Sequence, residues 1–109
     1  MVNPFIGTGG SGFGVGSIFP GPSAPFGMLA VSPDTSTPKY GIGFTHCAGY
    51  AYGDDYIYGF SHIHLHGTGV PDFGNLLTMP VSGEVTPAQF RDKEIRSGYD
   101  KSTEKASPG

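Results

Sequence analysis

The first 27 residues of the chain contain so much glycine and proline that regular secondary structure is disfavoured there. Six of the ten residues at 7–16 are glycine, and residues 19–27 include three prolines. Glycine makes helix and strand entropically costly, and proline fixes φ and removes a backbone donor. With 19 glycines and 10 prolines among 109 residues overall, we expect long loops and little helix.

The charge of the chain argues against a polyanionic partner. The formal net charge is −3, and Lys39 is the one basic residue before position 91. A chain without a basic stripe cannot neutralise many phosphates, so we expect neither nucleic acid nor an anionic membrane surface as partner. No segment approaches the roughly 18 consecutive apolar residues that a membrane-spanning helix needs. The sequence therefore predicts one domain with a single core and no membrane span.

The cellular compartment is not fixed by the residues alone. Met1 is followed by Val2, Asn3 and Pro4 rather than by a basic region and an apolar stretch, so this chain shows no signal peptide. The single Cys47 cannot form an internal disulfide, so cysteine usage is compatible with either redox environment.

Two segments in the first two thirds of the chain are typical of strands. Met28–Val31 is a short apolar run that ends at Ser32–Asp34, which predicts a buried strand followed by a turn. Tyr56–His66 is dominated by aromatic and β-branched residues and predicts the longest strand.

The last third of the chain predicts weaker elements. Residues 75–79 and 83–85 read as short strands that could pair as a hairpin, interrupted at Pro80, which cannot donate to a central ladder. Pro87 can open a short helix or turn, and the charged residues that follow it indicate a solvated segment. Together these elements predict an all-β, antiparallel fold with glycine- and proline-rich loops.

Three histidines alternate with apolar residues at the end of the longest predicted strand. In an extended chain, His62, His64 and His66 would share one face, about 6–7 Å apart, while Ile63 and Leu65 face the core. This spacing is compatible with a zinc site. It is more typical of hydrogen-bonded histidines on a polar face.

Two candidate ligands lie outside this strand. Cys47 or Asp72 could complete a metal site with the histidines. A cupin-like metal barrel also carries a His-x-His strand, but the Glu ligand expected downstream has no counterpart between His66 and Met79. The metal interpretation is therefore incomplete.

Two other patterns do not support catalysis. Gly7–Gly12 matches G-x-G-x-x-G, but it lacks the preceding strand and following helix that a dinucleotide site requires. Asp54 and Asp55 are adjacent, so in an extended chain they point to opposite faces and cannot flank one bond. Their place beside Gly53 favours turn chemistry, with an aspartate capping its own backbone.

A series of short motifs in a fixed order covers nearly the whole chain. The motifs are Val2–Gly10, Phe19–Gly21, Pro25–Met28, Ser32–Thr35, Cys47–Tyr50, Ile57–His62, His64–Leu65, Gly67–Gly69, Asp72–Gly74, Leu77–Pro80 and Glu104–Gly109. Their order resembles family 92 of the glycoside hydrolases, and the whole series is far more specific than any single motif.

The resemblance implies an inverting, calcium-dependent exo-α-mannosidase built from two domains. An N-terminal β-sandwich packs on a helical (α/α)6 barrel, with the active site at their junction. Residues 1–109 would be the N-terminal portion of the sandwich, an incomplete antiparallel β-sandwich, and the catalytic barrel is absent from this chain. Inversion needs two carboxyl groups about 6.5–9.5 Å apart. In the family both come from the barrel, so no catalytic residue or calcium ligand is expected here, and the fragment alone should be inactive.

The resemblance also implies what this segment contributes, which is one wall of the sugar pocket. A glycine-lined rim lets a sugar approach the backbone, and histidine or aspartate can bond a hydroxyl. The expected partners are a mannose-containing glycan and the missing catalytic domain, in the periplasm or outside the cell. The residues predicted to bind substrate are Phe44, Cys47, His62, His64, Gly67 and Asp72.

The chain departs from the family pattern at several positions. Phe44 stands where a tryptophan is expected, and His66 and Val70 replace the usual Ser and Cys around Gly67–Gly69. The glycine-rich loop before Phe19 also lacks the family's usual histidine. If Phe44 lines the pocket for the leaving sugar, the linkage preference would differ from the common α-1,2 activity. The alternative is a stand-alone β module that binds a metal, like a cupin, or a carbohydrate.

Overall fold

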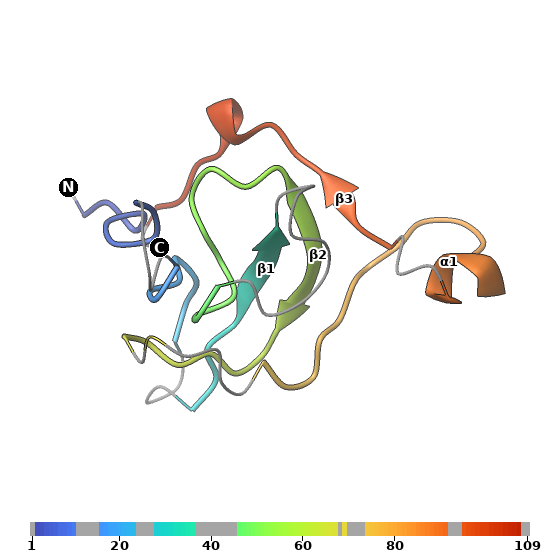
Figure 1. The fold of residues 1–109 in the computed structure, drawn as a ribbon, viewed down its shortest axis with the longest axis horizontal. Helices are drawn as coiled ribbons and strands as arrows, with labels where there is room; N and C mark the ends of the chain where they lie inside the picture. The colour runs from blue at the N-terminus through green and yellow to red at the C-terminus, as the bar shows by residue number, and fades with distance from the viewer. Residues whose placement is uncertain are drawn as a thin grey trace.

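The described residues form a small all-β unit around one antiparallel sheet. The computed structural model describes residues 2–10, 16–23, 28–36, 46–67, 69, 74–91 and 95–107. Its elements are β1 (Ser32–Ser36), β2 (Tyr56–Ser61), α1 (Pro87–Arg91), β3 (Ser97–Gly98) and the 3-10 helix η1 (Lys101–Thr103). The strands are ordered β1-β2-β3, with both neighbouring pairs antiparallel (Figure 1). The predicted all-β, antiparallel class with little helix is confirmed.

Strand β1 lies where the sequence predicted a turn. Met28 and Leu29, in the segment predicted as a buried strand, are 79% and 42% exposed. Ala30 alone is buried among the described apolar residues of that run, in an isolated bridge to Ser23. The strand begins two residues later, at Ser32. It tolerates a proline because β1 is an edge strand, where a missing donor breaks no central ladder.

Strand β2 confirms the first half of the longest predicted strand. It pairs with β1 from Tyr56 opposite Ser36 to Ser61 opposite Ser32, and the register shifts once, between Asp34 and Thr35. Such a bulge adds local twist and re-aims the neighbouring side chains.

Regular alternation ends after Ser61, so the predicted second half of this strand is wrong. The amide of His62 donates to the Asn75 carbonyl, while the His62 carbonyl accepts from the Ala30 amide. The chain here is therefore held by single bonds to two segments. Ile63, expected in the core, is 37% exposed.

The two weaker strands predicted in the last third do not form within described residues 74–91. Thr78 makes an isolated bridge to Phe60, and residues 83–85 belong to no strand or hairpin. The short helix expected at Pro87 is present as α1. Thr86 precedes it, and the Gln89 side chain accepts from the Thr86 amide at 2.8 Å, as in a capping box.

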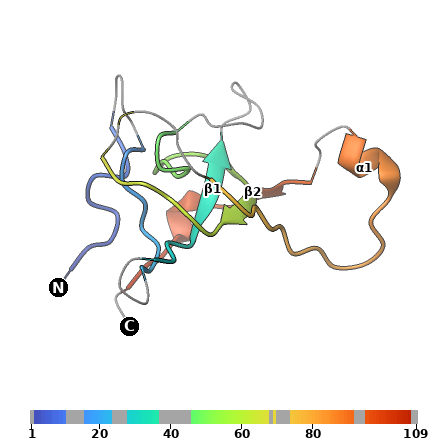
Figure 2. The same ribbon diagram turned by 90° about the horizontal axis from the view of Figure 1, so that it is seen from below.

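A long segment carries α1 away from the sheet. Residues 79–91 leave the body and end in α1 at the far side of the molecule, as both ribbon views show (Figures 1 and 2). Most of their described side chains are exposed. We call residues 79–91 and 95–98 the arm. Within the described part of the chain, no helix has the length and apolar character needed to cross a bilayer.

Among the described residues, more polar than apolar side chains are buried. The apolar cluster consists of Phe19, Ala30, Ala48 and Tyr50, with Phe5 packed against it. The Tyr50 hydroxyl donates to Glu104 at 2.6 Å, which brings the end of the described chain to the core. The buried polar residues are Thr8, Ser32, Asp34, Thr35, Ser36, Asp54, Ser61 and His64. Burying a polar group is costly unless it is hydrogen-bonded, and most of these side chains are, although the Ser32 and Ser36 hydroxyls have no partner among the described residues. Specific hydrogen bonds therefore hold much of this unit together.

Candidate functional site

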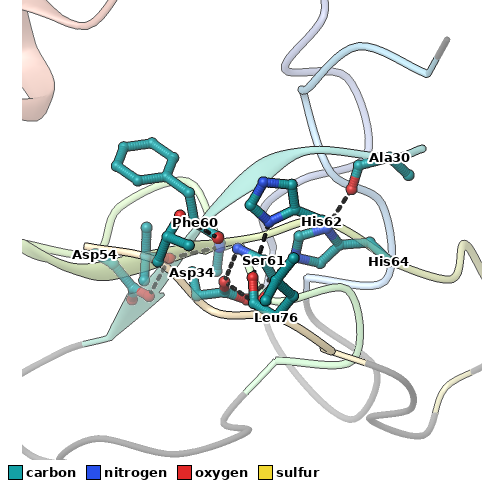
Figure 3. Close-up of polar contacts among 11 residues, drawn as sticks. Ala30, Asp34, Asp54, Phe60, Ser61, His62, His64 and Leu76 are labelled. Atoms are coloured by element: carbon teal, nitrogen blue, oxygen red, sulfur yellow. Dashed lines mark hydrogen bonds and ion pairs between the residues drawn. The ribbon is translucent and has the colours of Figure 1, made fainter. Parts of the chain in front are cut away.

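A buried aspartate of β1 organises the centre of the site. One carboxylate oxygen of Asp34 accepts from the backbone amide of Ser61 at 2.8 Å and from its hydroxyl at 2.5 Å. The other oxygen lies 3.1 Å from Nε2 of His64, and both side chains are 2% exposed. The second ring nitrogen, Nδ1, lies 2.7 Å from the carbonyl oxygen of Ala30. Figure 3 shows these contacts converging between β1 and the chain after β2.

The partners of His64 define its charge. A carboxylate and a carbonyl can only accept hydrogen bonds, so a ring that bonds both must donate from both nitrogens and is an imidazolium. Burial lowers the pKa of His64, but the hydrogen bonds to Asp34 and the Ala30 carbonyl, with the charge of Asp34, outweigh it. The net effect is a raised pKa. Asp34 and His64 therefore form a buried ion pair.

Gly49 closes over this ion pair. Its φ is +81°, and a Cβ there would collide with an Asp34 carboxylate oxygen and lie 2.8 Å from Nε2 of His64. The Gly49 carbonyl accepts from the Thr35 amide at 2.8 Å. Only glycine combines this backbone conformation with so close an approach.

A second histidine–aspartate pair is linked to β1 through Thr35. Nε2 of His46 lies 2.7 Å from Oδ2 of Asp54, and the Thr35 hydroxyl donates to the same oxygen at 2.8 Å. The Thr35 oxygen in turn accepts from the Ala51 amide at 3.0 Å. Two consecutive residues of β1 thus contact the two pairs: Asp34 is part of the first, and Thr35 is hydrogen-bonded to Asp54 of the second.

The turn predicted at Asp54 is present, since the Asp54 amide donates to the Ala51 carbonyl at 3.2 Å. The predicted capping by its side chain is wrong, because the carboxylate accepts from Thr35 and His46. Asp54 is 4% exposed as a residue. The side chain of Asp55 is 50% exposed and pairs with Lys101 at 3.1 Å. As expected, the two adjacent carboxylates do not flank a common point.

Three loops meet beside the ion pair. The Ala48 amide donates to the Gly16 carbonyl at 2.6 Å, and the Gly67 amide donates to the Ser17 carbonyl at 2.7 Å. The ring of Phe19 lies 5.1 Å from that of His64 and 4.1 Å from that of His66, between centroids. We call residues 16–19, 46–50 and 64–67 the three-loop edge.

The predicted binding residues are distributed unevenly over this edge. Cys47 is half-buried within it, and Gly67 is exposed at its end. His64 lies beneath the surface with both ring nitrogens bonded inside the protein. Phe44 and Asp72 lie outside the described residues.

The prediction that the three histidines share one face is wrong. His64 is buried, His66 is exposed, and half-buried His62 points its Nδ1 at the Leu76 carbonyl, 2.8 Å away. The reason is that strand alternation stops at Ser61.

The described residues do not offer a metal site. Across them, no group of three or more His, Cys, Asp and Glu side chains is arranged to hold a metal ion. Calcium takes six to eight oxygen ligands. The two buried carboxylates, Asp34 and Asp54, are instead engaged by protein donors, so these residues do not fit calcium.

Sequence reasoning missed the residues that build this centre. In the sequence, Asp34 and Ser61 stand out only as members of the motifs Ser32–Thr35 and Ile57–His62, no pattern marks His46, and the residues around Asp54 favour a turn. The partners of Asp34 lie 27 and 30 residues away. The one signal in the sequence was the grouping of His46, Asp54 and the Ser-Pro-Asp-Thr segment within 23 residues, 32–54.

Comparison with known proteins gives consistent matches along the whole chain. The sequence model described as "Glycosyl hydrolase family 92 N-terminal domain" matches residues 1–109. A solved family GH92 α-mannosidase from Bacteroides thetaiotaomicron is 40% identical over 98% of this chain, with a TM-score of 0.71. A second structure of that enzyme, in complex with mannoimidazole, gives the same identity, coverage and TM-score. The chain spans 14% of those solved chains. No curated protein sequence matches it significantly.

Proposed function

The chain belongs to glycoside hydrolase family 92 as its N-terminal domain, and on that premise we propose that it forms one wall of the substrate pocket of an exo-α-mannosidase. The observation that carries the proposal is the 40% identity, over 98% of this chain, to an α-mannosidase that has been solved with mannoimidazole bound. Because the chain spans 14% of that enzyme, the rest of the pocket comes from polypeptide outside these residues.

The three-loop edge is the part of the chain that suits a sugar wall. Hydrogen bonds to the Gly16 and Ser17 carbonyls fix its backbone, and exposed Gly67 leaves it without a side chain at one end. In our proposal Cys47, His62 and Gly67 face the glycan, together with Phe44 and Asp72. His64 orders the wall through Asp34, because both its ring nitrogens are already bonded. A rigid, preformed wall lowers the entropic cost of binding a sugar.

In the proposed enzyme, carboxyl groups outside this chain cleave the glycosidic bond. An inverting reaction needs one carboxylic acid to protonate the leaving oxygen and one carboxylate to activate water. Asp34 and Asp54 cannot serve, because each is buried and accepts hydrogen bonds from protein donors. The calcium ion of the proposed enzyme would bind to ligands outside this chain and would lie against the sugar's hydroxyls, which it would polarise. The enzyme would act on mannose-containing glycans in the periplasm or outside the cell.

The activity is tested with the full-length polypeptide that carries this domain. We expect it to release terminal α-mannose in the presence of calcium, to stop when the metal is chelated, and to produce β-mannose first by NMR. The isolated 109 residues should release none. Retention of the α anomer, or turnover by the isolated chain, would contradict the proposal. Tight stoichiometric zinc binding by the isolated chain would instead favour a stand-alone metal-binding module.

A bulky substitution on the three-loop edge tests whether this edge lines the substrate pocket. In the full-length enzyme, Cys47→Trp should raise KM because the half-buried Cys47 side chain lies on the three-loop edge. The matched control is Ser82→Trp, on the exposed arm, which should leave KM unchanged. Equal effects of the two substitutions on KM would show that the three-loop edge does not line the pocket.

A further inference from the structure

We propose that His46 is a substrate-contacting residue whose second ring nitrogen, Nδ1, accepts a hydrogen bond from a glycan hydroxyl. The inference rests on the proposed function and adds a residue that neither the family match nor the predicted set Phe44, Cys47, His62, His64, Gly67 and Asp72 assigns. It comes from the geometry of the second histidine–aspartate pair.

Nε2 of His46 is committed to a hydrogen bond with Asp54. Nε2 lies 2.7 Å from Oδ2 of Asp54, and the two side chains are 12% and 5% exposed. The same oxygen accepts from the Thr35 hydroxyl at 2.8 Å, which locks the carboxylate in place. Since a carboxylate oxygen accepts, Nε2 carries the hydrogen. In the neutral ring, Nδ1 is then an acceptor.

The backbone holds the ring in one position. His46 begins a tight turn in which its carbonyl accepts from the Gly49 amide at 3.1 Å, and Ala48 is tied to Gly16 at 2.6 Å. Gly16 has φ +74°, and a Cβ there would lie 2.6 Å from Cβ of His46. Glycine at 16 thus makes room for the base of the His46 side chain. A side chain fixed by both its backbone and its inner hydrogen bond is preorganised for binding.

The bonding of Nδ1 distinguishes His46 from His64. Both nitrogens of His64 are bonded inside the protein, whereas no described residue bonds Nδ1 of His46. The His46 side chain is 12% exposed, compared with 2% for that of His64. The position is next to Cys47 on the three-loop edge. A hydroxyl group is the ligand that suits a single oriented acceptor on a sugar-binding wall.

Two substitutions separate binding from structure. In His46→Gln, the amide nitrogen of Gln can take the place of Nε2 and keep the bond to Asp54, but nothing replaces Nδ1. In His46→Asn, the amide lies at the place of Nδ1 and cannot reach Asp54. The experiment measures kcat, KM and the thermal midpoint of both variants in the full-length enzyme, with an aryl α-mannoside and an α-linked mannobiose.

For His46→Gln we expect KM to rise about three- to tenfold, with kcat and the thermal midpoint nearly unchanged. This is the expected effect of losing one hydrogen bond that is made equally in the ground state and the transition state. His46→Asn should lower the midpoint and keep KM nearer the wild-type value. A KM change with mannobiose alone assigns the hydroxyl to the leaving sugar, and a change with both substrates assigns it to the terminal mannose.

Wild-type KM in His46→Gln would overturn the inference while leaving the proposed function intact. A KM rise that follows the fall in thermal midpoint across both variants would also overturn it, because His46 would then be structural. An inactive wild-type enzyme would overturn the proposed function and this inference with it.

Discussion

The centre of the molecule and its arm differ in how they are held. We call Asp34, Ser61 and His64, with His46, Asp54 and Thr35, the polar centre. Its hydrogen bonds are 2.5–3.1 Å long and its side chains are largely shielded from water. The arm is mostly exposed and returns to the sheet through the two-residue strand β3 and Arg96, whose guanidinium lies 4.5 Å above the Tyr56 ring.

This difference predicts where the protein tolerates change. A buried polar group that loses its partner retains the full cost of desolvation, whereas an exposed group regains water. The polar centre should therefore be sensitive to single atoms, and the arm should accept most substitutions. Four predictions test this contrast, and the first two have a matched counterpart at an exposed position.

The largest effect is expected at Gly49. An alanine there would need φ +81° and would press its Cβ into Asp34 and His64. The left-handed conformation alone costs about 1–2 kcal/mol for a residue with a Cβ, and the collision adds to this. We expect Gly49→Ala to abolish cooperative unfolding, as followed by near-ultraviolet circular dichroism in urea.

Gly83, on the arm, is the matched control for Gly49. It has a similar φ of +88°, but an added Cβ would meet no atom within 4 Å. Gly83→Ala should therefore cost only about 1 kcal/mol of unfolding free energy, the backbone contribution alone. Equal losses at the two glycines would show that backbone conformation, not the polar centre, decides the outcome.

The next effect concerns the buried ion pair. In Asp34→Asn the donors from Ser61 and His64 lose a carboxylate, and the buried imidazolium loses its counter-charge. Removing one partner of a buried pair typically costs about 3–5 kcal/mol. Asp55→Asn is the control, because Asp55 and Lys101 are 50% and 46% exposed, and such pairs contribute at most about 1 kcal/mol. Urea unfolding of the two variants would contradict the contrast if Asp55→Asn were the more damaging.

Strand β2 could be predicted from the sequence because its information is local. Tyr56–Ser61 is rich in aromatic residues, which favour a pleated and half-buried surface. Strand β1 could not be predicted in this way. Ser-Pro-Asp-Thr-Ser has the composition of a turn, and its burial becomes favourable only when Ser61 and His64 supply donors to Asp34 from 27 and 30 residues away.

The same reasoning explains the candidate site. The family resemblance identified the segments that form the three-loop edge, but it did not give the state of each side chain. Alternation predicted His64 on an exposed face, and a kink after Ser61, set by pairing with Ala30 and Asn75, buried it. His46 was missed because its partner Asp54 looked like a turn residue. Long-range hydrogen bonds, which no local pattern encodes, decide the burial of His64, whereas His46 and Asp54 are only eight residues apart.

The third prediction is a pH dependence of stability from His64. Its folded-state pKa is raised above the ordinary value of 6.5, so the ion pair contributes fully below about pH 6.5 and is lost as the pH rises through the folded pKa. The thermal midpoint should fall between pH 6 and pH 9. Tyr50, Tyr58 and Tyr99 do not interfere, because burial raises their pKa values. A midpoint that rises over this range would mean that His64 is neutral, and His64→Gln should flatten the slope.

The smallest effect is expected on the arm, at Arg96. Its guanidinium lies 4.5 Å from the centroid of the Tyr56 ring, a cation–π contact at an exposed position, and such contacts contribute about 0.5–1 kcal/mol. Arg96→Gln should lower the unfolding free energy by no more than this. Lys105→Gln, which removes the same charge from another exposed residue, should change it less. If Arg96→Gln lowered the unfolding free energy as much as Asp34→Asn, the arm would be part of the cooperative core. An exposed contact cannot contribute so much free energy unless the β2–β3 pairing is lost with it.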